Sequence, residues 1–211
     1  MKQDLKDYLE KEILSRYDEF DAAHRRDHAE KVIRESLKLA EGYEVDEDMV
    51  YTIAAYHDTG LIEDRKTHHL VSGRIMRTDM NLRKWFSEEK IEVMAQAVED
   101  HRASTDHIPR SIYGRIVAEA DRNIDPDIII LRTVQYGLSN YPELDRAGHI
   151  KRALQHLDEK YSQHGYMKLW IPGSENERRL HQLWRMLEDQ PAIVARIERI
   201  LDDYSDVSSP S

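Results

Sequence analysis

Cysteine is absent from this chain of 211 residues. Its absence excludes disulfide bonds, thiolate ligands for a metal ion and a cysteine nucleophile. Any metal site must therefore be built from histidine and carboxylate side chains, and the chain has 11 histidines and 41 aspartates and glutamates.

Long apolar runs are also missing. The longest run of large apolar residues is 128–131, which is far too short to span a bilayer. Residues 1–7 contain no apolar signal region. We therefore expect a cytoplasmic protein without a membrane partner.

Positively charged residues are also in the minority. The chain has 31 lysines and arginines against 41 aspartates and glutamates, which gives a net charge of −10. This balance excludes a broad nucleic-acid surface, which needs lysine and arginine to neutralise phosphates. A small anionic substrate remains open, provided that a local group of cations or a metal holds it. Whether the chain forms a homo-oligomer also stays open.

Apolar residues recur at helical spacing along the whole chain, and they predict an all-α protein. Residues 4–17 place apolar side chains four apart and predict an amphipathic helix. Ser87 is a plausible cap for a helix over 88–101, and a further helix is expected from Ile108-Pro109. We expect one domain, comprising an N-terminal helix over 1–19, a core over 20–125, C-terminal helices over 126–204 and a flexible tail over 205–211.

One helical stripe, Val50, Ile53, Ala54 and His57, runs directly into Asp58 and then Gly60. Both polar side chains should point at or beside a buried face. An ionised carboxylate there needs a cation, a hydrogen-bond network or a shifted pKa. Taken alone, the pair also fits a hydrogen-bonded core histidine at a helix C-terminus.

Similar polar residues lie near the ends of the other apolar stripes, namely His28, His68, His101 and Asp121. Each has an ordinary structural explanation, such as a core histidine or, for Asp121, a salt bridge with an arginine. Their repetition on separate predicted helices favours one shared site. No phosphate-binding glycine loop and no Gly-x-Ser-x-Gly motif accompanies them.

The order His28, His57-Asp58 and Asp121, each on its own predicted helix, resembles the signature of the HD-domain superfamily of metal-dependent phosphohydrolases. The resemblance covers roughly residues 20–125 and includes the contexts 21–24, 57–60 and 116–121. It implies a single-domain helical bundle of the HD type, here with additional C-terminal helices. It also implies that these four residues bind one divalent cation.

His68 and Asp100-His101 resemble positions that hold a second metal in some members of this superfamily. Asp100 stands where those members often have a histidine, so the resemblance leaves one or two cations open. Some members also place a catalytic acid shortly after the His-Asp pair. The nearest acids here are Glu63 and Asp64, which are therefore candidates together with Asp58.

The ligand set predicts a divalent cation such as Mn, Fe, Co, Ni, Zn or Mg. We expect hydrolysis of a phosphate ester or anhydride in a nucleotide or related small substrate, through metal-activated water. His24, Lys66 and Arg122 are the expected substrate contacts. Two alternatives are a dinuclear-iron oxygenase on the same scaffold and a catalytically silent nucleotide-binding regulatory module.

Overall fold

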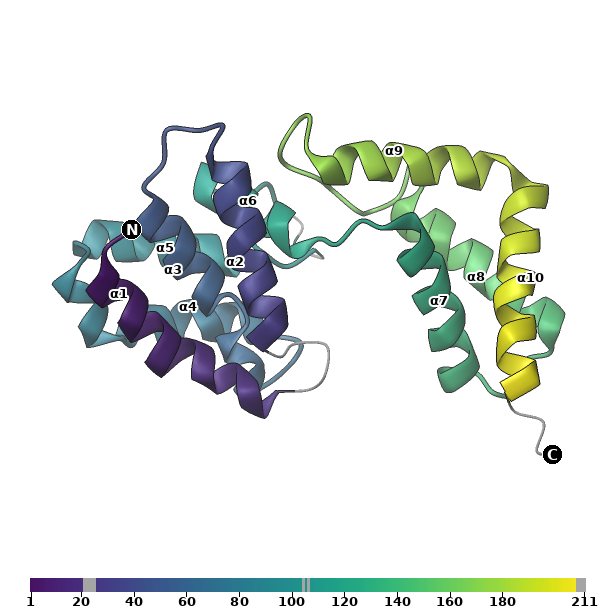
Figure 1. The fold of residues 1–211 in the computed structure, drawn as a ribbon, viewed down its shortest axis with the longest axis horizontal. Helices are drawn as coiled ribbons and strands as arrows, with labels where there is room; N and C mark the ends of the chain where they lie inside the picture. The colour runs from purple at the N-terminus through teal and green to yellow at the C-terminus, as the bar shows by residue number, and fades with distance from the viewer. Residues whose placement is uncertain (21–25, 104, 106, 208–211) are drawn as a thin grey trace. The chain divides into compact units, whose positions relative to one another are not determined.

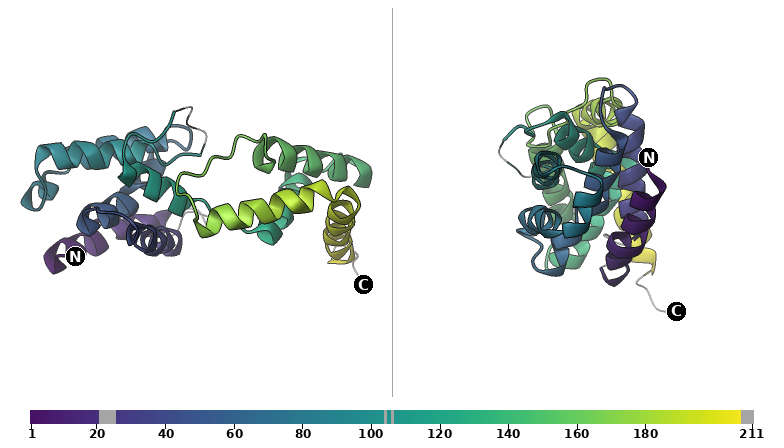
Figure 2. Two further views of the ribbon diagram at one scale, coloured as in Figure 1. Left: turned by 90° about the horizontal axis from the view of Figure 1, so that it is seen from above. Right: turned by 90° about the vertical axis from the view of Figure 1, so that its left-hand side faces the viewer.

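The computed structural model describes residues 1–20, 26–103, 105 and 107–207 of the chain. Regular structure in these ranges is entirely helical, which confirms the all-α prediction (Figure 1). Figure 2 shows the same helices from two further directions, without a strand in the described parts. None of the described helices is both long enough and apolar enough to cross a membrane.

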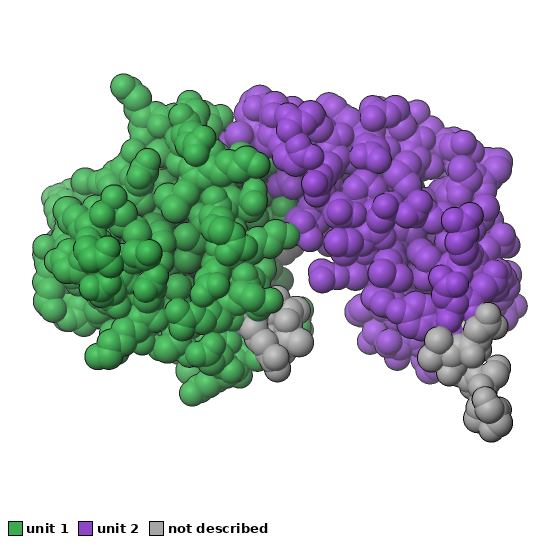
Figure 3. All heavy atoms as spheres, in the orientation of Figure 1, with its two compact units in different colours: residues 1–122 green, residues 123–211 purple. Residues whose placement is uncertain are grey.

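The chain divides into two compact units, residues 1–122 and 123–211 (Figure 3). Each unit has its own cluster of buried apolar side chains. The sequence predicts one domain, with C-terminal helices that continue it from residue 126. Within residues 123–211 the C-terminal helices bury their apolar faces against one another, and the single domain stays a prediction.

The N-terminal unit begins with one helical stretch whose winding changes along its length, namely α1 (Gln3–Tyr8), the wider turn η1 (Leu9–Ile13) and the tighter turn η2 (Leu14–Glu19). Its stripe of residues four apart is fully buried, as the sequence predicts: Leu5, Leu9, Ile13 and Tyr17. A change of helical winding alters the direction in which the following side chains point. Tyr17 is the last residue of the buried stripe and the one residue of the stripe with a polar group, its hydroxyl.

α3 (Glu47–Tyr56) is the central helix of this unit, and every residue from Asp48 to Tyr56 is buried. Asp46 caps it by accepting a hydrogen bond from the backbone nitrogen of Asp48. α2 (Arg26–Ala40) packs along it. Because α3 is enclosed, the His57-Asp58 pair at its C-terminal end is delivered into the interior.

The rest of the unit consists of η3 (Thr59–Ile62), α4 (His68–Thr78), η4 (Met80–Lys84), α5 (Glu88–Glu99) and α6 (Ile112–Asp121). Ser87 caps α5 as predicted, by accepting from the backbone nitrogen of Lys90. The prediction that the next helix starts at Ile108-Pro109 is wrong, because the helix starts at Ile112. Ser111 accepts from the backbone nitrogen of Gly114 and supplies the cap.

The C-terminal unit contains α7 (Pro126–Asn140), α8 (Arg146–Tyr161), α9 (Glu175–Glu188) and α10 (Gln190–Val207). Asp125 caps α7, and Pro126 occupies its first turn, where a missing backbone N–H costs nothing. The apolar side chains of α10 are buried at Ile193, Ile197 and Leu201. These side chains join α7, α8 and α9 in one apolar cluster.

Candidate metal centre

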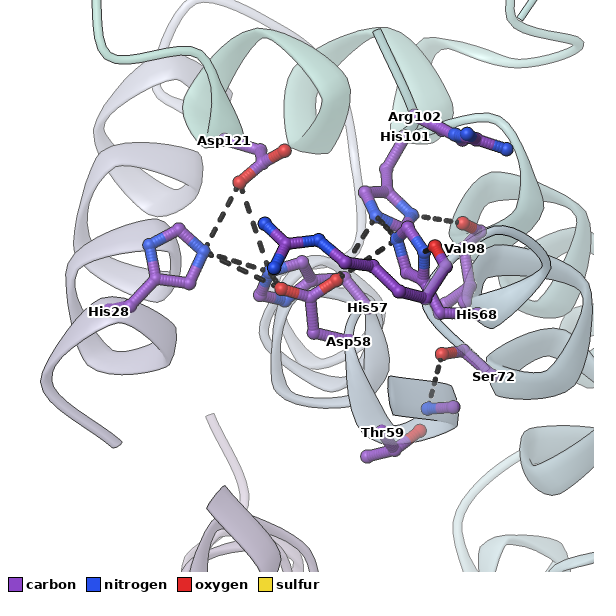
Figure 4. A network of polar contacts seen from close by, with 12 residues as sticks. His28, His57, Asp58, Thr59, His68, Ser72, Val98, His101, Arg102 and Asp121 are labelled. Atoms are coloured by element: carbon purple, nitrogen blue, oxygen red, sulfur yellow. Dashed lines mark hydrogen bonds and ion pairs between the residues drawn. The ribbon is translucent and has the colours of Figure 1, made fainter. Parts of the chain in front are cut away.

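Asp58 lies between two groups of histidines, and each of its carboxylate oxygens faces one group (Figure 4). Its Oδ2 is 3.2 Å from Nε2 of His57 and 3.7 Å from Nε2 of His28. Its Oδ1 is 3.2 Å from Nε2 of His68 and 3.4 Å from Nε2 of His101. One carboxylate therefore serves both groups.

Asp121 completes the first group. Its Oδ1 lies 3.2 Å from Nε2 of His28 and 3.9 Å from Nε2 of His57, and these two nitrogens are 3.3 Å apart. The side chains of His28 and Asp121 are 23% and 25% exposed, whereas that of His57 is wholly buried. Solvent and substrate can therefore approach this group on the side of His28 and Asp121.

The second group consists of Asp58, His68 and His101, whose ligand atoms lie within 4.8 Å of one another. The two Nε2 atoms of the histidines are 3.1 Å apart. Both side chains are largely enclosed, at 12% and 2% exposure. This group offers three protein donors, so a cation bound there would keep positions for water or substrate.

Ends of five helices meet at the centre. His28 and His68 stand at the start of α2 and α4, while His57, His101 and Asp121 stand at or just beyond the ends of α3, α5 and α6. Helix C-termini carry partial negative charge from their unpaired carbonyl groups. Three such ends therefore favour a cation at this place.

Three ligand histidines are fixed by the same local bond. The Nδ1 atoms of His57, His68 and His101 contact the carbonyl oxygen three residues earlier in the chain, at 2.7, 2.8 and 2.6 Å. Since a carbonyl can only accept, each Nδ1 carries a proton, and Nε2 of each ring offers its lone pair to a cation when that ring is neutral. Such support orients ligand rings and fixes their tautomer.

Tyr17 holds the backbone of the His-Asp pair. Its hydroxyl donates to the carbonyl of Ala55 at 3.0 Å and accepts from the backbone nitrogen of Asp58 at 3.1 Å. From the sequence, this residue is placed only on an amphipathic helix. Its polar role could have been inferred, because a single hydroxyl on a buried apolar stripe requires a hydrogen-bond partner.

Gly60 lies where the turn after Asp58 packs against the start of α4, the helix that carries His68. A Cβ atom at this position would lie 2.1 Å from the carbonyl oxygen of His68. The backbone nitrogen of Gly60 also donates to Oγ of Ser72 at 2.8 Å. The missing side chain thus allows the turn after Asp58 to pack directly on the first turn of α4, which brings His68 to the carboxylate.

Charges within the cluster support one another. Burial opposes ionisation of Asp58, but His57, His101 and His68 together hold the pKa of its carboxyl well below the ordinary value. Burial likewise works against a charged His57, yet Asp58 and Asp121 raise the pKa of its imidazole to about 9. Without a metal, a proton on His57 therefore compensates the buried carboxylates.

The donor set fits divalent cations. Two carboxylates and four imidazole nitrogens converge, and each nitrogen of known tautomer has its lone pair free for coordination. Nitrogen and oxygen donors of this kind suit borderline ions such as Zn, Fe, Mn, Co and Ni. The structure thus brings together all six predicted ligands: His28, His57, Asp58, His68, His101 and Asp121.

Glu63 and Asp64 have structural contacts that account for both carboxylates. Glu63 pairs with Arg74 at 2.5 Å on an exposed surface. Oδ2 of Asp64 accepts from the backbone nitrogens of Lys66 and Thr67 and from the Thr67 hydroxyl, which shapes the turn before α4. These contacts give both acids a structural role, and a catalytic role for either one stays a prediction.

Asp100 is explained by the loop that follows α5. Its carboxylate is buried and accepts from the backbone nitrogen of Arg110 at 2.7 Å and from His107 Nε2 at 2.9 Å. The guanidinium of Arg110 adds a third contact at 2.8 Å. Asp100 anchors this loop rather than replacing a metal ligand, and the adjacent His101 reaches the centre by itself.

The three predicted substrate contacts have different outcomes. His24 lies outside the described residues. Lys66 is exposed, and its carbonyl accepts a hydrogen bond from Arg102, the neighbour of ligand His101. Arg122 is buried at the end of α6 and donates to the carbonyl of Ala118, and its role as a substrate contact stays a prediction.

Comparison with known proteins gives one finding for this region. Residues 25–123 match the family model described as the HD domain. No curated protein and no solved structure matches the chain. The matched segment contains all six ligands of the centre but excludes Tyr17, which supports the backbone of Asp58 from outside it.

Proposed function

This chain belongs to the HD-domain superfamily through residues 25–123, and on that premise we propose that it is a metal-dependent phosphohydrolase. The substrate in this proposal is a nucleotide or a related small phosphate compound. Superfamily members are generally metal-dependent hydrolases, and the cluster of histidine and aspartate side chains is suited to hold the metal.

The observation that carries the proposal is the position of Asp58, whose two oxygens face two different histidine groups. This arrangement favours a pair of cations over a single one. When bound, such a pair supplies activated water, polarises a phosphoryl oxygen and stabilises the leaving oxygen. The sequence alone had left one or two cations open.

The protein's own residues contribute position and charge. His57, His68 and His101 present fixed nitrogen donors, so no rearrangement of their rings is needed. The partly exposed His28 and Asp121 form the accessible side, where a phosphate can approach. Because the whole chain carries a net charge of −10, a small phosphate compound held locally fits better than a nucleic-acid polymer.

A phosphate-release screen tests this function. The full chain would be loaded separately with Mn, Fe, Co, Ni, Zn and Mg and given nucleoside mono-, di- and triphosphates and simple phosphomonoesters. We expect release from at least one substrate, and loss of release in Asp58→Asn, which removes the shared charge. Dioxygen uptake by the iron-loaded protein without phosphate release would favour an oxygenase. Metal-dependent nucleotide binding without turnover would favour a regulatory module.

A further inference from the structure

A small hollow of about 320 Å³ lies in the N-terminal unit next to elements of the metal centre. Among the described residues, its wall combines apolar and charged side chains: Glu19, Phe20, Leu61, Ile62 and Arg65. None of these residues is a ligand in the centre. Ligand pockets in proteins occupy roughly 300–1,000 Å³, so this hollow suits a single ring system.

Both walls of the hollow are connected to residues of the metal centre by ring contacts or hydrogen bonds. On one wall, the ring of Phe20 meets the ring of Tyr17 edge to face, with centroids 5.3 Å apart. The Tyr17 hydroxyl in turn accepts from the backbone nitrogen of Asp58. One buried aromatic residue, Tyr17, therefore links this wall of the hollow to the backbone of Asp58.

The other wall follows Asp58 along the chain. The backbone nitrogen of Leu61 donates to the carbonyl of Asp58 at 3.0 Å. The carbonyl of Arg65 accepts from Nδ1 of the ligand His68 at 2.8 Å. A molecule in the hollow would thus lie against the same turn that carries the bridging ligand.

The chemistry of the wall matches a flat heteroaromatic ring. Phe20 is partly buried, while the side chain of Ile62 is 64% exposed to solvent although it is large and apolar. Covering these side chains with an aromatic ring is favourable. The Glu19 carboxylate can accept hydrogen bonds from ring N–H groups.

The charges around the hollow and at the metal centre favour different parts of such a ligand, namely its ring and its phosphate. Glu19 would repel a phosphate placed in the hollow, whereas divalent cations at the neighbouring histidine groups would attract it. The complementary arrangement is a ring in the hollow and a phosphate at the metal centre.

We propose that the hollow lined by Phe20, Leu61 and Ile62 binds the heteroaromatic base of a nucleotide whose phosphate lies at the metal centre. This inference rests on the proposed phosphohydrolase function for the phosphate half. The base half depends only on the hollow and can be measured without turnover.

The first experiment measures binding of unphosphorylated nucleosides. Adenosine, guanosine, cytidine and uridine would be titrated into the full chain with EDTA present, with ligand-observed NMR as the readout. Ile62→Ser and Ile62→Trp alter an exposed side chain that borders the hollow, so the fold should be retained. We expect at least one nucleoside to bind, Ile62→Ser to weaken its binding about tenfold through lost apolar contact, and Ile62→Trp to tighten it by stacking on the base.

Met80→Ser is the matched control, because Met80 is an apolar side chain with 68% exposure that lies elsewhere, on η4. It should bind the nucleoside as the unmodified protein does. Equal nucleoside affinity in the unmodified protein, Ile62→Ser and Ile62→Trp would overturn the inference. Failure of all four nucleosides to bind the unmodified protein would overturn it as well.

A second measurement, of phosphate release, distinguishes failure of this inference from failure of the proposed function. If nucleosides bind through Ile62 but no phosphate is released with any metal, the hydrolase proposal fails and the hollow stands. The opposite outcome would be phosphate release with no effect of Ile62→Ser on the hollow. In that case Ile62→Ser would leave nucleoside affinity unchanged, and it would also leave unchanged the KM for a nucleoside monophosphate relative to the KM for glycerol phosphate. The base-binding inference would then fail and the hydrolase proposal would stand. Melting temperatures confirm that each variant is folded.

Discussion

The backbone nitrogen of Asp58 donates a hydrogen bond of 3.1 Å to the hydroxyl of Tyr17, a residue that precedes the matched family segment. Both groups are buried. The N-terminal helical stretch is therefore part of the support of the metal centre and not only a cover for the core.

Replacing Tyr17 with phenylalanine should weaken the centre. The change leaves the backbone N–H of Asp58 buried without this partner, which costs about 1–3 kcal/mol of unfolding free energy. Loss of an outer partner of a metal ligand lowers metal affinity about 10- to 100-fold. Urea denaturation and calorimetric metal titration would measure the two effects. Tyr8→Phe is the control, since its hydroxyl contacts Asp79 instead, and an equal loss of metal affinity in both variants would contradict the assignment.

Metal stoichiometry should depend on which group is altered. His101→Ala removes a donor from the second group only, and Asp121→Asn removes charge from the first group only. We expect a fall from two equivalents to one in each variant, because either group retains ligands when the other is damaged. Asp58→Asn should impair both sites, since it serves both groups. Elemental analysis after dialysis would decide, and one equivalent in the unmodified protein and His101→Ala alike would exclude the second site.

Gly60→Ala should disrupt the junction between the two groups. The added Cβ would lie 2.1 Å from the His68 carbonyl, so backbone must move, at a cost of roughly 1–3 kcal/mol or more. We expect a lower melting temperature and loss of the second cation before the first. Gly42→Ala is a matched control, because the nearest atom to its added Cβ is 3.9 Å away. Equal stability of the two variants would refute the close-approach argument.

Acid should remove the stabilising effect of Asp79. Burial opposes its ionisation, but hydrogen bonds from Tyr56 at 2.5 Å and from Tyr8 lower the pKa of this carboxyl below its ordinary value of 3.8. Its contribution is therefore full above pH 3.8 and disappears as the pH falls through the folded-state pKa. The difference in unfolding free energy between the unmodified protein and Asp79→Asn should therefore be constant from neutral pH to about pH 4 and shrink as the pH falls further. A difference that stays constant below about pH 4 as well would contradict the expectation.

Positions on helical stripes indicated from sequence which histidine and aspartate side chains would meet at the candidate metal centre. His57 and Asp58 follow an apolar stripe that ends in a glycine, and His101 ends another. Local pattern indicates which face a residue lies on, so polar residues at the ends of buried stripes were natural candidates. The identity of the fold as an HD domain was confirmed for residues 25–123.

Contacts between distant segments could not be predicted in the same way. The bond from Tyr17 to Asp58 joins residues 41 positions apart, and the approach of Gly60 to His68 depends on the path of a turn. Asp64 is a second case, because its sequence position in a loop beside the His-Asp helix suggests a catalytic acid. Its carboxylate binds two backbone nitrogens within three residues, a local turn interaction that aspartate commonly makes. A catalytic role for Asp64 stays a prediction.

The bonds from His57, His68 and His101 to carbonyls three residues earlier also affect how a cation binds. Each bond removes rotational freedom from an imidazole ring before any ion arrives. The entropy of ordering these rings is therefore lost when the protein folds and not when the metal binds. Uptake of an ion should need little conformational rearrangement, and its removal should leave these three rings in place.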